Sequence, residues 1–112
     1  EEKLIFYNFL RKEEKKLASE IKLTPEQMRS RAKSYANESQ NLQKSISNMD
    51  KLIKALESEW KGDASKAYAA RYNSLKPAFK NCKELMDELS ANLKQSAKIM
   101  EETDKKIASQ LK

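Results

Sequence analysis

The chain has 112 residues, a formal net charge of +6 and 36% charged residues, yet only one Gly and two Pro. So few turn-forming residues exclude a many-stranded sheet, which needs such residues at each reversal, and favour a few long helices. Because the chain has no His and a single Cys, it cannot assemble a Cys/His zinc site, a His-dependent nucleophile or an internal disulfide, and we expect neither an enzyme nor a cofactor.

Residues 1–20 make up the first segment, in which an apolar run at residues 4–10 precedes a charged run at residues 11–16. Helix-like spacing is shown by Phe6, Leu10, Glu13 and Leu17. An expression leader, an upstream extension and a genuine third helix are all compatible with this pattern. As a native helix, the segment could dock its apolar face on the end of the last helix.

The first strong helix signal is Thr24-Pro25-Glu26-Gln27. Thr24 supplies an N-cap hydroxyl, Pro25 takes the first helical position, and Gln27 can reach back to the cap. We therefore expect a helix over residues 25–60, with apolar side chains at a four-three spacing that only Ser39 interrupts. The stripe consists of Met28, Ala32, Tyr35, Ser39, Leu42, Ile46, Met49, Ile53, Leu56 and Trp60.

A turn is expected at residues 61–63, where the only Gly of the chain follows its only Trp by two positions. Gly62 comes just after the last periodic residue, where a helix can end in the left-handed conformation that Gly adopts most readily. Asp63 can then cap the next helix. The chain should reverse its direction here.

The second long helix is expected over residues 64–111. Pro77 should kink it by removing one backbone hydrogen bond and crowding the carbonyl of Asn73, and a break into two helices is the lesser alternative because the apolar spacing stays in phase. Cys82 lies on the stripe, which predicts a buried, inert thiol. The stripe consists of Tyr68, Tyr72, Leu75, Phe79, Cys82, Met86, Leu89, Leu93, Ser96, Met100, Thr103 and Ile107.

The short turn predicts an all-α fold in which the two helices form an antiparallel hairpin. At about 1.5 Å per residue the arms measure about 54 Å and about 72 Å, so residues 100–111 should project as an exposed amphipathic end. A lone hairpin buries few faces, which predicts an obligate dimer, most simply a homodimer, that forms a four-helix bundle. The expected interface consists of Leu52, Ile53, Leu56, Trp60, Tyr72, Phe79, Leu85 and Met86.

With Trp60-Lys61-Gly62 in the turn of such a hairpin, the chain resembles the WXG family, the small early-secreted-antigen-like substrates of bacterial type VII (ESX-type) secretion. The resemblance covers residues 21–111 and includes the opening Ile21-Lys22-Leu23-Thr24-Pro25-Glu26. It implies a helical hairpin that forms a homodimer, or a heterodimer with a related protein, and that is exported folded without a cleaved signal peptide.

The second motif of the family is matched in its broader form by residues 100–111, which read apolar-x3-Asp-x2-apolar-x3-apolar, with Met100 in place of the Tyr of the stricter form. The four motif positions fall on one helix face. The resemblance implies that the secretion ATPase reads this element together with the W-x-G turn of the partner subunit. The implied recognition residues are Trp60, Gly62, Met100, Asp104, Ile107 and Leu111.

The resemblance thus implies a secreted bacterial protein that acts as a substrate of the type VII system or as the co-secreted partner of a larger toxin. The alternative is an intracellular helical adaptor whose W-x-G reflects hairpin architecture alone. Basic residues alternate with acidic ones along both arms, so we expect no specific nucleic-acid partner and at most a peripheral membrane contact. No segment reads as a membrane span or as a cleaved signal peptide.

Overall fold

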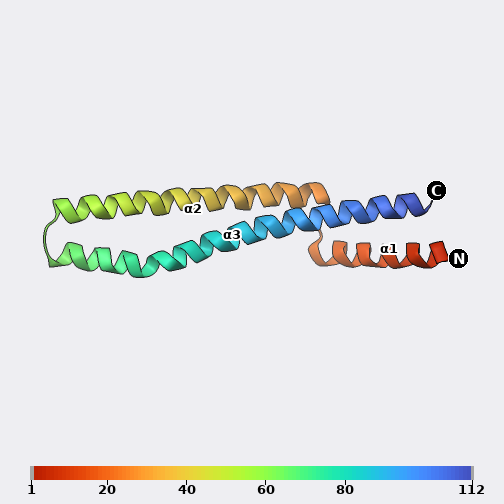
Figure 1. Cartoon of the computed structure of the whole chain (residues 1–112), viewed down its shortest axis with the longest axis horizontal. Coiled ribbons are helices and arrows are strands. Elements are labelled where there is room, and N and C mark those ends of the chain that lie inside the picture. The colour runs from red at the N-terminus through yellow and green to blue at the C-terminus, as the bar shows by residue number, and fades with distance from the viewer. Residues whose placement is uncertain (1, 112) are drawn as a thin grey trace. The chain divides into compact units, whose positions relative to one another are not determined.

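The part of the chain that the structure describes forms three helices: α1 (Glu2–Ile21), α2 (Pro25–Glu59) and α3 (Asp63–Gln110) (Figure 1). The computed structural model describes the backbone of residues 2–111 and, within this range, the side chains of residues 2–13 and 22–111, so the side chain of Leu17 lies outside it. Residues 2–111 contain no strand. The prediction of an all-α helical hairpin is confirmed.

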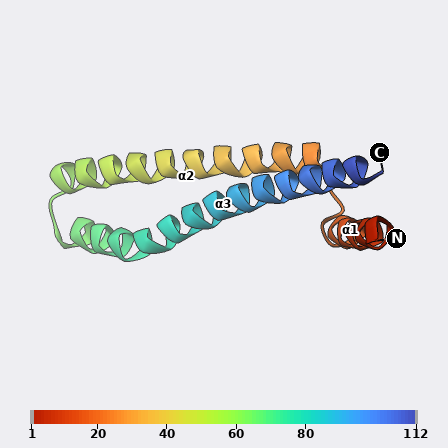
Figure 2. The same cartoon turned by 45° about the vertical axis from the view of Figure 1, so that its right-hand side comes forward.

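Two compact units make up the chain. Glu1–Lys33 and Ser90–Lys112 form one, here called the terminal unit, and Ser34–Leu89 form the other, here called the turn unit. In the turn unit, α2 and α3 run antiparallel from the turn that joins them (Figure 1). In the terminal unit, α1 lies near the last turns of α3 in Figure 1, whereas Figure 2 looks nearly along the axis of α1, so the two helices are inclined to each other.

The start of α2 is fixed by a capping box. The backbone N–H of Gln27 donates to Thr24 Oγ1 at 3.1 Å, and the backbone N–H of Thr24 donates to Gln27 Oε1 at 3.0 Å. The backbone N–H of Met28 also donates to the carbonyl of Thr24 at 2.9 Å, as the first hydrogen bond of the helix. The cap that Thr24 and Gln27 predicted is therefore confirmed, and it satisfies backbone groups that a helix end leaves open.

The turn between α2 and α3 differs in detail from the expectation. Gly62 has a φ of 158°, far from the left-handed helical value of about +57°. Its carbonyl accepts hydrogen bonds from the backbone N–H of Lys66 at 3.4 Å and from Ser65 Oγ at 3.0 Å. A residue whose carbonyl accepts the first bond of a helix is its N-cap. Gly62 thus caps α3, and Asp63 is its first residue rather than its cap.

Pro77 lies inside α3, which continues as one helix from Asp63 to Gln110. The chain therefore does not break into two helices there. Figure 1 shows that the ribbon of α3 changes direction in its green-to-teal stretch, within the turn unit.

Both units have thin cores made largely of small side chains. In the terminal unit, Met28, Ala97 and Met100 form a buried cluster, against which Leu23 and Leu93 pack. The buried residues of the turn unit are Ser39, Ile46, Ser65, Ala69 and Tyr72. Small residues let the two backbones approach closely, but they leave much of each apolar stripe without cover.

The prediction of a buried thiol at Cys82 is wrong, because this side chain is exposed. Its stripe neighbours Leu75 and Phe79 are exposed as well, as are Tyr35 and Met49 on α2. The apolar stripe of each helix is wider than the seam along which two helices touch, so its flank remains in solvent. The apolar periodicity predicted the position of each stripe, but it did not predict which side of the stripe the other helix of the hairpin covers.

Candidate recognition site

The W-x-G turn presents an exposed pair of aromatic rings. Trp60 follows the last residue of α2 directly, and its backbone N–H donates to the carbonyl of Leu56 at 2.8 Å, which holds it in the final helical turn. Its ring centroid lies 6.2 Å from that of Tyr68, with the planes tilted by 34°. Such a tilted pair is a favourable aromatic geometry. Trp60 remains 46% exposed, so it fills no core and is available for contact.

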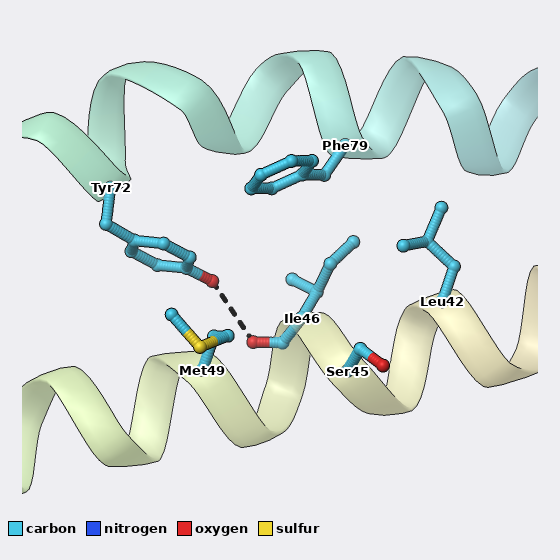
Figure 3. A pocket seen from close by; sticks show the side chains of 6 residues that line it. All are labelled: Leu42, Ser45, Ile46, Met49, Tyr72 and Phe79. Atoms are coloured by element: carbon cyan, nitrogen blue, oxygen red, sulfur yellow. Dashed lines mark hydrogen bonds between the residues drawn. The ribbon is translucent and has the colours of Figure 1, made fainter.

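An apolar groove runs along the turn unit between α2 and α3. One part of it is drawn in Figure 3, where Leu42, Ile46 and Met49 of α2 face Tyr72 and Phe79 of α3. The groove continues toward the turn, where its lining consists of Met49, Ile53, Leu56, Tyr68, Arg71, Tyr72, Leu75 and Phe79. Apart from Arg71, these side chains offer an apolar or aromatic surface.

The expected interface residues are placed unevenly around this groove. Ile53, Leu56 and Phe79 line it. Tyr72 also lines it but is only 7% exposed, so it belongs mainly to the packing of α2 on α3. Leu52 and Leu85 are 63% and 56% exposed and are not part of the groove lining. Met86 is partly buried on α3, and Trp60 lies at the turn.

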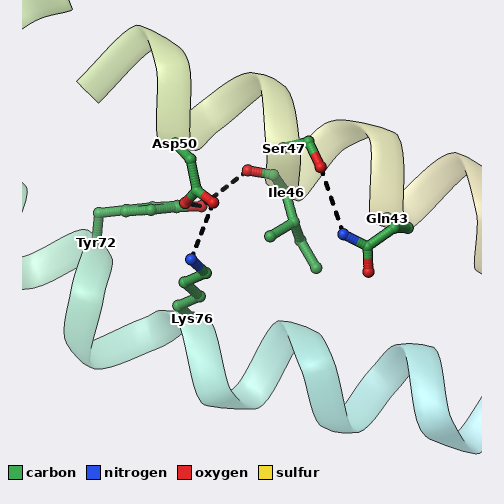
Figure 4. A network of polar contacts seen from close by, with 6 residues as sticks. All are labelled: Gln43, Ile46, Ser47, Asp50, Tyr72 and Lys76. Carbon is green, nitrogen blue, oxygen red and sulfur yellow. Dashed lines mark hydrogen bonds and ion pairs between the residues drawn. The ribbon is translucent and has the colours of Figure 1, made fainter. Parts of the chain in front are cut away.

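A polar cluster behind the groove ties α2 to α3 (Figure 4). Tyr72 Oη donates to Asp50 Oδ1 at 2.8 Å, with the carbonyl of Ile46 as a second acceptor at 3.2 Å, and Lys76 Nζ donates to Asp50 Oδ2 at 2.9 Å. The hydrogen bonds from Lys76 and Tyr72 lower the pKa of Asp50. Burial, followed by the bond to Asp50, raises the pKa of Tyr72. Both pKa shifts favour an ionised Asp50 that accepts a hydrogen bond from the neutral phenol of Tyr72.

Two further carboxylates act in the same way. Asp87 accepts hydrogen bonds from Ser39 across the helix pair and from Lys83 on its own helix, and these bonds lower its pKa. In the terminal unit, Arg29 holds Glu101 through two hydrogen bonds of 3.2 Å and 2.9 Å, which lower the pKa of Glu101. Each of the three carboxylates accepts a hydrogen bond from the opposite helix.

The C-terminal motif is only partly exposed. Met100 and Ile107 are each 7% exposed, whereas Asp104 is exposed and Leu111 is 65% exposed. The expectation that residues 100–111 form an exposed end is therefore wrong for Met100 and Ile107. Met100 packs into the cluster with Met28, and α1 lines a pocket with Gln110 and Leu111 at the end of α3. The expectation from helix lengths left out α1.

Sequence reasoning missed the polar ties between the helices. Ser39 was visible as the one break in the first stripe, and it is the donor to Asp87. Ser90, whose hydroxyl donates to the carbonyl of Ala32 at 2.8 Å, carried no comparable signal. In the described part of the chain, no buried side-chain polar atom lacks a hydrogen-bond partner.

The described residues hold no cluster of three or more Cys, Asp or Glu side chains suited to a metal ion. They also include no helix long and apolar enough to cross a membrane.

These features define a class of protein: a small helical hairpin with an exposed W-x-G turn and an apolar groove beside it. A family described as proteins of 100 residues with WXG matches residues 20–105. This chain belongs to that family, WXG100.

The relatives agree in length with the hairpin. Protein YukE of Bacillus subtilis is 36% identical over 96 residues, which cover 86% of this chain and 99% of YukE. The type VII secretion system extracellular protein A of Staphylococcus aureus is 23% identical over 88 residues, covering 79% of this chain and 91% of that protein. The crystal structure of EsxA from Geobacillus thermodenitrificans superposes with a TM-score of 0.75 at 38% identity, covering 80% of this chain and 98% of EsxA.

Proposed function

We propose that this protein is a small secreted protein of a type VII secretion system, exported in its folded state and without a cleaved signal peptide. Its membership of the WXG100 family supports this, as does its similarity to a staphylococcal protein named as extracellular in such a system. The observation that carries the proposal is the W-x-G turn itself, because Trp60 is half exposed beside Tyr68 and adds little to the core.

The groove of the turn unit is the proposed dimer interface. Burying an apolar surface of this kind against a second copy would stabilise a hairpin whose own core is thin. The expected interface residues Ile53, Leu56 and Phe79 line the groove, which supports their assignment. The exposed Leu52 and Leu85 would lie at the margin of the same interface. We assign a homodimer, and a heterodimer with a related hairpin would use the same surface.

The secretion ATPase is the proposed reader of two elements. Trp60 and Gly62 of one subunit would supply the first, and Met100, Asp104, Ile107 and Leu111 of its partner would supply the second. The exposure of Trp60, Asp104 and Leu111 supports this role. The buried Met100 and Ile107 would set the position of the exposed pair. The protein would travel as a substrate or escort a larger toxin with a similar helical domain.

Export is the test. Trp60→Ala and Asp104→Lys should each reduce the amount of protein in the culture medium by about tenfold or more, because each removes a contact that the ATPase needs. Matched controls are Lys61→Ala, which shortens the exposed side chain next to Trp60 in the same turn, and Glu102→Lys, which changes an exposed carboxylate two positions earlier. Both controls should be exported, and all four variants should keep the sedimentation behaviour of the wild type.

Loss of the ATPase should abolish export of every variant. Equal export of Trp60→Ala, Asp104→Lys and their controls would reject the recognition role. A protein that stays inside the cell whether or not the ATPase is present would instead support an intracellular helical adaptor.

A further inference from the structure

Helix α1 lies almost entirely outside the family match, which begins at residue 20, yet it packs on the element proposed as a recognition motif. Lys3, Leu4 and Tyr7 of α1 line one pocket together with Gln110 and Leu111. α1 therefore lies against the end of α3 on the side that includes the last residue of the motif, Leu111.

The hold of α1 on α3 is weak. Among residues 2–13, only Tyr7 and Leu10 are partly buried. The other large apolar side chains of this stretch stay exposed, by 43% to 71% of their area. They are Leu4, Ile5, Phe6 and Phe9. Because few side chains of residues 2–13 leave the solvent on docking, undocking this part of α1 costs little.

The connection between α1 and α2 also favours movement. It spans residues 22–24, and Lys22 has a φ of 55°, in the left-handed region that residues other than Gly seldom adopt. The break at residues 22–24 displaces α1 sideways from α2, so that the two do not continue as one helix (Figure 1). A short non-helical link next to a lightly packed helix can act as a hinge.

We infer that α1 is a detachable cover over the C-terminal recognition motif, an inference that rests on the proposed function. While α1 is docked, Asp104 is exposed, whereas Gln110 and Leu111 at the apolar end of the motif lie beside Lys3, Leu4 and Tyr7 of α1. A partner that grips Asp104 together with this apolar end must displace α1 first. The apparent affinity of this partner is then its affinity for the uncovered form multiplied by the fraction of molecules that are uncovered.

The first measurement asks whether α1 covers α3, and it needs no partner. Tyr7→Asp places a charge on the docked face of α1, whereas Phe9→Asp places the same charge on an exposed position of the same helix. Amides of residues 103–110 should exchange at least about threefold faster in Tyr7→Asp than in the wild type, and unchanged in Phe9→Asp. Equal exchange in all three proteins would overturn the inference.

The second measurement asks whether uncovering matters for recognition. The pair Leu4→Cys/Gln110→Cys, in a Cys82→Ser background, joins two residues that line the same pocket and should lock α1 down when oxidised. The pair Ile5→Cys/Gln110→Cys is the control, because Ile5 does not line that pocket. The probe is the recombinant nucleotide-binding region of the type VII secretion ATPase from the same organism.

Tyr7→Asp should bind this probe at least about threefold more tightly than the wild type. The oxidised lock should bind at least about tenfold more weakly, and reduction should restore binding. Equal binding of Tyr7→Asp and of the oxidised Leu4→Cys/Gln110→Cys protein would overturn the inference that α1 is a cover. Failure of every form, Tyr7→Asp included, would instead reject the proposed function and with it the cover. Asp104→Lys, which should abolish binding in both backgrounds, tells these outcomes apart.

Discussion

Gly62 is the residue at which backbone geometry matters most. Its φ of 158° is a conformation that L side chains rarely adopt, and its carbonyl receives the first hydrogen bond of α3. An added Cβ would meet no atom within 4 Å. The need for Gly therefore comes from the backbone conformation and not from lack of space. The sequence pointed to this residue as the end of α2, but its role as the cap of α3 depends on hydrogen bonds that a pattern does not specify.

Replacing Gly62 should cost the same for small and large side chains. Gly62→Ala should lower the free energy of unfolding by about 1–3 kcal/mol, the usual cost of a strained backbone conformation. Gly62→Leu should cost about the same, because the space around the position is open. Urea unfolding at a fixed protein concentration measures both. A much larger loss in Gly62→Leu would mean that packing, not φ, selects Gly.

At the scale of the helices, the ends of α2 and its buried positions were predictable, because capping and heptad spacing are local properties. Thr24 and Gln27 form the expected box, and Met28, Ala32 and Ile46 are buried. The exposure of Cys82 and the burial of Ile107 were not predictable, because each depends on what other helices cover. Periodicity describes one helix at a time.

The ties between α2 and α3 make the fold sensitive to acid. The pKa of Asp50, of Asp87 and of Glu101 is lowered by hydrogen bonds from Lys76, from Ser39 and from Arg29 respectively. A pKa below its unfolded value means that the carboxylate stabilises the fold above that value, which is 3.8 for Asp and 4.5 for Glu. This contribution is lost as the pH falls through the lower folded value.

Stability should therefore fall as the pH decreases from about 5 to about 2. Asp50→Asn should be less stable than the wild type at neutral pH, since the amide is a weaker acceptor for Lys76, and it should lose less stability over this range. Glu84→Gln, at an exposed position of α3, is the control and should follow the wild type. Thermal unfolding followed by circular dichroism measures the trend. Parallel acid curves for Asp50→Asn and the wild type would contradict the role given to Asp50.

For the whole molecule, the main feature is the contrast between a thin core and a broad apolar surface. Met28 and Ser39 are the largest fully buried side chains, whereas Met49, Leu75 and Phe79 remain exposed along the groove. A soluble chain seldom leaves so large an apolar patch in water unless a partner covers it. The composition already suggested this shortage of core, but only the structure shows which residues form the patch.

Met49→Glu should weaken self-association by at least about tenfold, because it places a charge at the centre of the proposed interface. Lys51→Glu, two positions further along α2 and also exposed, is the matched control and should leave association unchanged. Analytical ultracentrifugation over a range of concentrations compares the two. A wild type that remains a helical monomer at micromolar concentrations would reject the dimer outright.

The polar ties of the turn unit also have a mechanical consequence. Apolar helix faces can slide past each other by one turn and still make apolar contacts. The hydroxyl of Ser39, by contrast, donates to one carboxylate across the helix pair, that of Asp87, and the hydroxyl of Tyr72 donates to that of Asp50. Shear between the helices would break both of these hydrogen bonds at once. When α2 and α3 are pulled in opposite directions along the hairpin axis, they should therefore keep their register until these hydrogen bonds break together.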